Sequence, residues 1–169
     1  FSDAEPVLSR TFNAKGIVYD PDGDDDLPDV VSILDEFTQN DTGSYVLSED
    51  EDGHVITTTS NKAPWSFVFI TLEGNYKAYT EIRIEVNGTA GARFKMKLEG
   101  ATITAYETGS TADGNIEDPL LDGTWQTFVW HVPSDHMTFG EPVMFIIFFE
   151  PGDQGTGVTM TVRSLELAK

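Results

Sequence analysis

The sequence predicts an all-β protein, an antiparallel β-sandwich or jelly roll. Three observations predict it: short runs of alternating apolar and polar residues follow one another along most of the chain, Gly, Asp and Pro turns separate them, and helical periodicity is nearly absent. A chain of 169 residues, 39% of them hydrophobic, is long enough for one domain with a sizeable core. Eight or more short strands in such a domain are typical of two packed sheets.

The first 29 residues are expected to lie outside this sandwich. They show no strong period and end in residues 20–29, where Pro, Gly and like charges oppose regular structure. We interpret residues 1–29 as an acidic lead-in or linker with room for one short strand around 11–19, and residues 30–169 as the β-sandwich domain. Within the latter, residues 30–37 are short and β-branched and fit a strand as well as a helix.

The predicted strands follow one another closely from residue 54 onward. Their ranges are 54–60, 65–72, 80–86, 93–98, 102–106, 124–132, 143–149 and 158–167. In strands 80–86 and 93–98 apolar residues alternate with charged ones, so one face of each strand is expected in the core. We predict that these two strands form one hairpin, whose outer face carries the basic residues Arg83, Arg93, Lys95 and Lys97. Such a face is either a solvated surface with cross-strand ion pairs or a ligand surface.

Residues 143–149 differ from the other strands because they are apolar at every position. A strand that is apolar on both faces is normally covered on both faces. The alternative is that its outer face is exposed for binding.

The charge of the chain argues against two classes of partner. Twenty-nine acidic residues oppose ten basic ones, which gives a net charge of −19 and a pI near 4.1. Nucleic acids and anionic membrane surfaces attract basic proteins, so neither is expected to bind. The longest apolar run has seven residues, whereas a membrane-spanning helix needs about 20, so no membrane insertion is expected.

Four segments of the chain carry a family resemblance. They are Leu-Asp-Glu-Phe at 34–37, the Tyr-Lys stretch and strand at 74–88, the Trp-centred strand at 123–130, and the last two strands with the Gly-rich turn 152–157 between them. Together they resemble the β-sandwich (jelly-roll) carbohydrate-binding modules of bacterial secreted glycan-active proteins. The resemblance covers about residues 30–167 and does not assign a numbered family.

The resemblance implies a non-catalytic module that tethers a secreted or cell-surface protein to a polysaccharide or oligosaccharide. It also implies an extracellular location and further domains on the same polypeptide. Such modules often hold a structural calcium ion through an Asp in the last strand, where this chain has Ser164 and Glu166. The alternative function is a structural or adhesive spacer domain of a surface or scaffold protein, without a sugar site.

A sugar presents apolar C–H faces and a rim of hydroxyl groups, so its site needs exposed aromatic rings beside planar polar side chains. Candidate ligand-binding residues are Trp125, Tyr76, Tyr106, Trp65, Arg83, Arg93, Gln126 and His131. For any one aromatic residue the alternative is a place in the core, as we expect for Trp130. Tyr76 lies in a turn and is expected to be exposed. A module should expose at least two aromatic rings on one platform or groove, whereas a spacer should bury them all.

The densest group of candidate metal ligands is an acidic string made of Asp20, Asp22, Asp24 and Asp26. Its spacing starts like a calcium-binding EF-hand loop, but Val31 stands at the twelfth position, where that loop needs Glu. Structural calcium at this string and a solvated acidic linker are therefore both open interpretations.

Motifs for catalysis are missing from the sequence. There is no cysteine nucleophile, no Gly-x-Ser-x-Gly elbow, and no phosphate-binding glycine loop. The twenty-nine carboxylates are too many to single out a hydrolytic pair. We predict that the chain is not an enzyme and needs no cofactor other than calcium.

Overall fold

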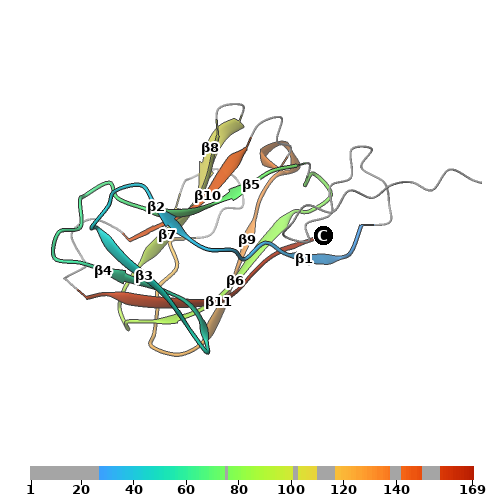
Figure 1. Ribbon diagram of the computed structural model, residues 1–169. Helices are drawn as coiled ribbons and strands as arrows, with labels where there is room; N and C mark the ends of the chain where they lie inside the picture. The colour runs from blue at the N-terminus through green and yellow to red at the C-terminus, as the bar shows by residue number, and fades with distance from the viewer. Residues whose placement is uncertain (1–26, 75, 101–102, 110–116, 138–141, 150–156) are drawn as a thin grey trace, which may run out of the picture.

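The computed structural model describes residues 27–169 except 75, 101–102, 110–116, 138–141 and 150–156. Within these ranges eleven strands form two antiparallel sheets that pack against each other around one core (Figure 1). The six-stranded sheet contains β3 (Tyr45–Asp50), β4 (Gly53–Thr58), β11 (Thr159–Ala168), β6 (Glu81–Gly88) and β9 (Gln126–His131) in this order, and β1 (Val30–Ser32) pairs with β11. The five-stranded sheet has the order β2 (Thr38–Gln39), β5 (Val68–Leu72), β10 (Val143–Phe149), β7 (Phe94–Gly100) and β8 (Ile103–Glu107). The predicted all-β sandwich is confirmed.

Alternating residues of both sheets fill the space between them, as the period of two predicts. The inward-facing side chains include Ile82, Ile84 and Val86 from β6 and Phe94, Met96 and Leu98 from β7, all fully buried. Trp130 is also fully buried, as expected, and its ring stacks on that of Tyr106 at 5.5 Å between centroids. Since Trp130 lies on β9 and Tyr106 on β8, this stack joins the two sheets along one side of the sandwich.

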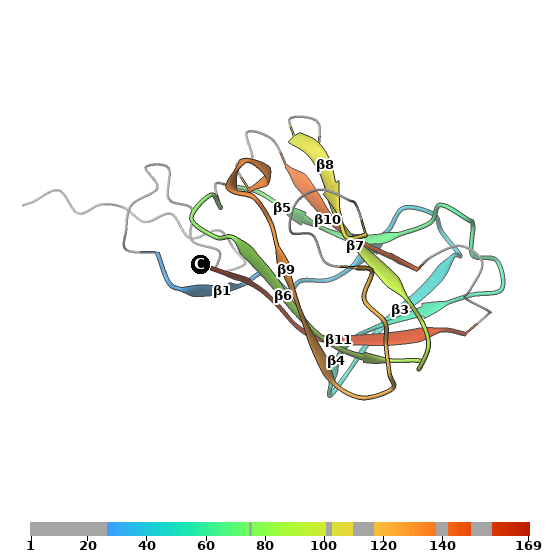
Figure 2. The same ribbon diagram turned by 180° about the vertical axis from the view of Figure 1, so that it is seen from behind.

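The expected hairpin of residues 80–86 and 93–98 is wrong. The two strands lie in different sheets: β6 pairs with β11 and β9, whereas β7 pairs with β10 and β8. The reason is the connection after Gly88, which is long enough to cross from one sheet to the other. Gly91, at φ +84°, donates its N–H to the carbonyl of Leu121 in this crossing. Figure 2 shows β6 and β7 in different sheets. Because Arg83 alternates with the buried residues of β6, and Lys95 and Lys97 with those of β7, Arg83 is on the outer face of one sheet and the two lysines are on that of the other.

The first part of the sandwich contains a strand that was not expected and settles the conformation of residues 30–37. Strand β3 was not predicted, although the Asp52-Gly53 pair that follows it is a hairpin signal. Gly53 is required there, because it has φ +139° and a Cβ atom would lie 2.3 Å from the carbonyl oxygen of Val162. Residues 30–37 form the short strand β1 and a non-helical connector that leads to β2 in the other sheet.

The chain before β1 already contacts the sandwich. Tyr79 donates its hydroxyl to the carbonyl of Pro28 at 3.0 Å, and Lys169 donates its N–H to the carbonyl of Asp29 at 3.0 Å. The boundary between residues 29 and 30 stays a prediction, and the strand expected around 11–19 lies outside the described residues. No helix among the described residues is long and apolar enough to span a membrane.

The expectation that Tyr76 is exposed is wrong. Its side chain is 2% exposed, its N–H donates to the carbonyl of Met137 at 2.9 Å, and its hydroxyl donates to the carbonyl of Glu73 at 2.8 Å. The turn thus folds back onto the core instead of presenting the ring to solvent. Burial, followed by the negative charge of Glu73, raises the pKa of Tyr76 from 10.0 to about 12.

This shift predicts a loss of stability in alkali. The unfolded chain releases the Tyr76 proton near pH 10 and the folded chain only near pH 12, so the free energy of unfolding falls as the pH rises through this interval. We expect Tyr76 to account for about 2 kcal/mol of the loss at pH 12. Urea unfolding between pH 8 and 12 measures it. The Tyr76→Phe variant should be less stable at pH 8 but show a flatter pH dependence; an unchanged slope would contradict the assignment.

Candidate functional site

A groove of about 660 Å³ runs over the outer face of the five-stranded sheet. Its lining residues come from β7, β8, β10 and the segment just before β5: Trp65, Phe67, Lys95, Lys97, Glu99, Glu107, Ile146 and Phe148. Strand pairing explains how they meet, because β10 lies between β5 and β7 and sets Ile146 opposite Phe69 on one side and Lys97 on the other. The groove therefore combines an apolar side with a charged side.

The apolar side arises from the strand that is apolar at every position. The inward set of β10 is fully buried in the core, whereas the outward residues Met144 and Phe148 are half-buried and Ile146 is 1% exposed. The structure thus combines the two interpretations of residues 143–149: the outer face of β10 is partly covered and partly open to the groove. Ile146 forms the floor, and Phe148 is accessible from the groove.

Trp65 stands at the rim of the groove and is 80% exposed, the largest exposed aromatic side chain among the described residues. Hydrogen bonds hold the backbone of residues 65–67. Asn40 donates its side-chain amide to the carbonyl of Trp65 at 3.4 Å and accepts the N–H of Phe67 at 2.7 Å, while Tyr45 donates its hydroxyl to the carbonyl of Ser66 at 2.6 Å. A fixed backbone presents the ring to a ligand at little ordering cost.

The charged side of the groove is also fixed by neighbours. Lys95 Nζ lies 3.4 Å from Asp118 Oδ2, and Asp118 Oδ1 accepts a hydrogen bond from the buried Thr108 at 3.0 Å. Thr108 in turn accepts the N–H of Met96 at 3.1 Å, which ties the cluster to β7. Lys97 forms an ion pair with Glu99 on the same face. The groove thus presents ammonium donors beside carboxylate acceptors.

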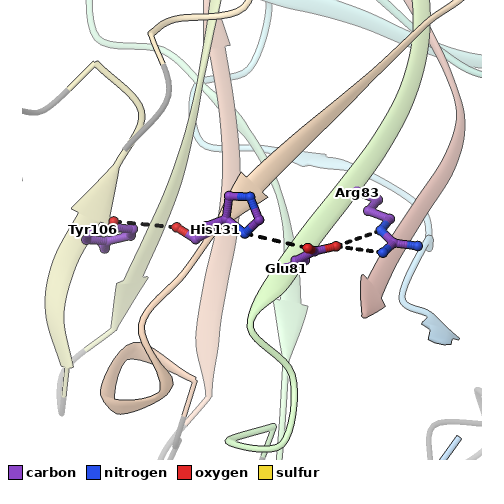
Figure 3. A network of polar contacts seen from close by, with 4 residues as sticks. All are labelled: Glu81, Arg83, Tyr106 and His131. Carbon is purple, nitrogen blue, oxygen red and sulfur yellow. Dashed lines mark hydrogen bonds and ion pairs between the residues drawn. The ribbon is translucent and has the colours of Figure 1, made fainter. Parts of the chain in front are cut away.

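Four of the predicted ligand residues lie on other parts of the molecule. Figure 3 shows three of them in one series of contacts, from Tyr106 to His131, from His131 to Glu81, and from Glu81 to Arg83. Tyr106 is 6% exposed, its ring stacks on those of Trp130 and His136, and its hydroxyl lies 3.5 Å from the carbonyl of His131. Glu81 lies 3.6 Å from the His131 ring and accepts two hydrogen bonds from Arg83, at 2.9 and 2.6 Å. The fourth, Tyr76, is in the core as described above.

The remaining candidates outside the groove are engaged in local contacts. The guanidinium of Arg163 lies 4.0 Å above the ring of Trp125 and forms hydrogen bonds of 3.0 and 2.5 Å with Glu85, so Trp125 is covered rather than presented. Gln126 accepts the N–H of Asp122 at 3.0 Å, and Arg93 donates to the carbonyl of Asp118 at 3.1 Å. Of the eight predicted residues, Trp65 alone lines the groove.

Sequence reasoning missed most of the groove. Phe67, Glu99, Glu107, Ile146 and Phe148 were not named as ligand residues, and Lys95 and Lys97 were placed on a hairpin that does not exist. Two sequence features could have identified these groove residues: the apolar outer set of residues 143–149 and the outward lysines of residues 93–98. Both features lie on one surface because β10 pairs with β7.

Metal ligands are not grouped in the part of the chain that the structure covers. Among the described residues no three His, Asp or Glu side chains lie close enough to hold a metal ion. Asp20, Asp22, Asp24 and Asp26 lie outside the described residues, so calcium at the acidic string stays a prediction.

Comparison with known proteins extends the description of the fold. No protein-family model matches the sequence, and no curated protein matches it either. Among solved structures, a single-residue variant of a family 29 carbohydrate-binding module, made to probe ligand recognition, matches with a TM-score of 0.56 and 14% identity over 82% of this chain and 91% of the other. The xylan-binding module CBM15 matches with a TM-score of 0.55 and 14% identity over 82% and 95%. A further family 29 module matches with a TM-score of 0.51 and 16% identity over 74% and 73%. The chain therefore shares the β-sandwich fold of carbohydrate-binding modules.

Proposed function

We propose that this domain is a non-catalytic carbohydrate-binding module whose ligand lies in the groove over β5, β10, β7 and β8. The observation that carries the proposal is the Trp65 ring, 80% exposed at the rim of a groove that also contains Phe67 and Phe148. Burying so large an apolar side chain is favourable, so an exposed Trp on a fixed backbone indicates a surface that is covered by a ligand. The shared fold of the neighbouring modules supports the same function.

The chemistry of the groove fits a sugar chain. The C–H face of a pyranose ring would stack on Trp65, and further rings would contact Phe148 and the Ile146 floor. Lys95 and Lys97 would donate to sugar hydroxyls, and Glu99 and Glu107 would accept from them. An open groove, unlike a closed pocket, leaves room for a polymer to continue beyond both ends.

The spacer alternative is disfavoured by the same groove, because a spacer would bury its aromatic rings. An enzyme would need two converging carboxylates or a bound metal at the ligand. Glu99 and Glu107 both line the groove, but Glu99 forms an ion pair with Lys97, which favours a binding surface over a hydrolytic carboxylate pair. We propose that the domain holds other domains of the same extracellular polypeptide near a polysaccharide, which raises their local concentration.

The experiment that tests the function is retention on a panel of polysaccharides in affinity electrophoresis, with and without calcium. Xylan is one member, since one structural neighbour is named for binding it. Mannan, cellulose and a polyuronate complete the panel. We expect retention by a neutral polysaccharide, with NMR shifts of the Trp65 indole and of β7 and β10 amides. Absence of retention for the folded, calcium-loaded protein would overturn the proposal in favour of the spacer.

A further inference from the structure

One edge of the six-stranded sheet is open. Strand β3 is the last strand of that sheet and pairs with β4 on one side only. At its beginning the free side is occupied, because the Gln39 side-chain amide donates to the carbonyl of Tyr45 and accepts its N–H, both at 3.2 Å. Gln39 therefore occupies the place that a neighbouring strand would take.

The direction of the other backbone groups of β3 follows from the hydrogen bonds of β4. Thr58 bonds away from β3: its N–H donates to the carbonyl of Val158 at 2.9 Å, and its carbonyl accepts from Gly157 at 3.0 Å. In an antiparallel pair the bonded residues alternate, so Val46, Ser48 and Asp50 bond to β4, whereas Tyr45, Leu47 and Glu49 face the free edge. Leu47 and Glu49 have no backbone partner on that edge among the described residues.

A small pocket of about 240 Å³ lies beside these two residues, on the inner side of β3 and β4. The connector between β1 and β2 contributes Glu36 and Phe37 to its lining. The apolar lining comprises Phe37, Leu47, Val55 and Ile56, and the polar lining comprises Glu36, Ser48, Glu49 and His54. Among the described residues no Lys or Arg lines it, and two of its lining residues, Glu36 and Glu49, are exposed carboxylates.

On the other side of the same edge, Val46 is 56% exposed and is one of the four exposed large hydrophobic residues in the described chain. A strand added to β3 would present alternate side chains to the two sides. One set would face the acidic pocket and the other would face Val46. An alternation of basic and apolar residues fits both sides at once.

We propose that the free edge of β3 binds an extended basic peptide segment, which pairs with Leu47 and Glu49 as an added strand and inserts a Lys or Arg side chain into the pocket. Edge pairing supplies backbone hydrogen bonds, and the pocket selects the side chain. The charge of the chain, −19, favours a basic partner over a second copy, since two copies would repel one another. This site lies on the other sheet from the proposed glycan groove, so either function can fail alone.

The test uses the whole chain and an acetylated, amidated peptide of alternating Lys and Val, titrated by NMR at low salt. We expect saturable binding, with slower hydrogen exchange at the amides of Leu47 and Glu49. A second peptide, N-methylated at alternate residues, carries the same charge but cannot form the backbone bonds and should bind at least tenfold more weakly. Equal binding of both peptides would mean charge attraction alone and would overturn the proposal, as would no binding of the first.

Two variants of Glu49 separate the contribution of its backbone N–H to binding from the contribution of its carboxylate. Glu49→Gln removes the carboxylate and should weaken binding about threefold. Glu49→Pro also removes the edge-facing N–H, which β4 does not use, and should weaken binding about tenfold more. Glu73→Gln, an exposed charge change that neither pocket nor groove contains, is the matched control and should leave binding unchanged. If the Glu49→Pro variant retains its circular dichroism spectrum and binds like Glu49→Gln, strand addition is ruled out.

Discussion

Replacing Trp65 by Ala is expected to weaken binding of the retained polysaccharide about thirtyfold, since covering a Trp ring with a sugar contributes about 2 kcal/mol. The ring is 80% exposed and contributes little to the core, so the free energy of unfolding should stay within about 0.5 kcal/mol of the wild type. Isothermal titration calorimetry with an oligosaccharide of the retained polymer measures the affinity, and urea unfolding measures the stability.

Trp125→Ala is the matched control for this loss. Trp125 is also a surface Trp, but it lies under Arg163 on the other sheet, away from the groove. Its removal should leave glycan affinity unchanged. If Trp125→Ala abolished binding and Trp65→Ala did not, the site would be on the outer face of the six-stranded sheet, and the groove would be the wrong surface.

Replacing Trp130 by Ala is expected to have the largest effect on stability. The side chain is fully buried and stacks on Tyr106 across the two sheets at 5.5 Å and an interplanar angle of 5°. Its loss removes apolar burial from both sheets and leaves a cavity, which should lower the free energy of unfolding by about 3–5 kcal/mol. Urea unfolding followed by circular dichroism measures the change without relying on tryptophan fluorescence.

Two milder variants test the same prediction if Trp130→Ala does not fold. Trp130→Phe keeps an aromatic ring against Tyr106 and should cost less than Trp130→Ala, about 1–3 kcal/mol. Trp125→Ala should cost less still, because its ring is only half-buried. A Trp130→Ala variant as stable as the Trp125→Ala variant would show that the stack does not hold the sheets together.

Period-two alternation predicted the faces of strands but not their partners. In residues 81–86 it placed Ile82, Ile84 and Val86 in the core, and that is confirmed. It could not show that the next strand belongs to the opposite sheet, because a connection through Gly91 suits a hairpin or a crossing equally well. The choice between a hairpin and a crossing to the other sheet depends on hydrogen bonds to strands that are distant in the sequence. The residue preferences of the connection itself do not predict those bonds.

Exposure of aromatic side chains was the weakest part of the sequence analysis. Tyr76 sits in a turn and is buried, whereas Trp65 belongs to a predicted strand and is exposed. The difference depends on Asn40 and Tyr45, which fix the backbone around Trp65 from positions twenty or more residues earlier. The apolar outer set of residues 143–149 gave the better signal for the groove surface.

The place of β11 sets the order in which this domain can form. Residues 159–168 come after all the other strands in the sequence, yet they lie in the middle of the six-stranded sheet, between β4 and β6. During synthesis, β4 and β6 therefore lack their shared neighbour until β11 has been made. A chain truncated before residue 159 would have β3 and β4 on one side and β6 and β9 on the other, with no strand to join them. The six-stranded sheet cannot be completed before residues 159–168 are available, because its most central pairing closes a loop over the whole domain.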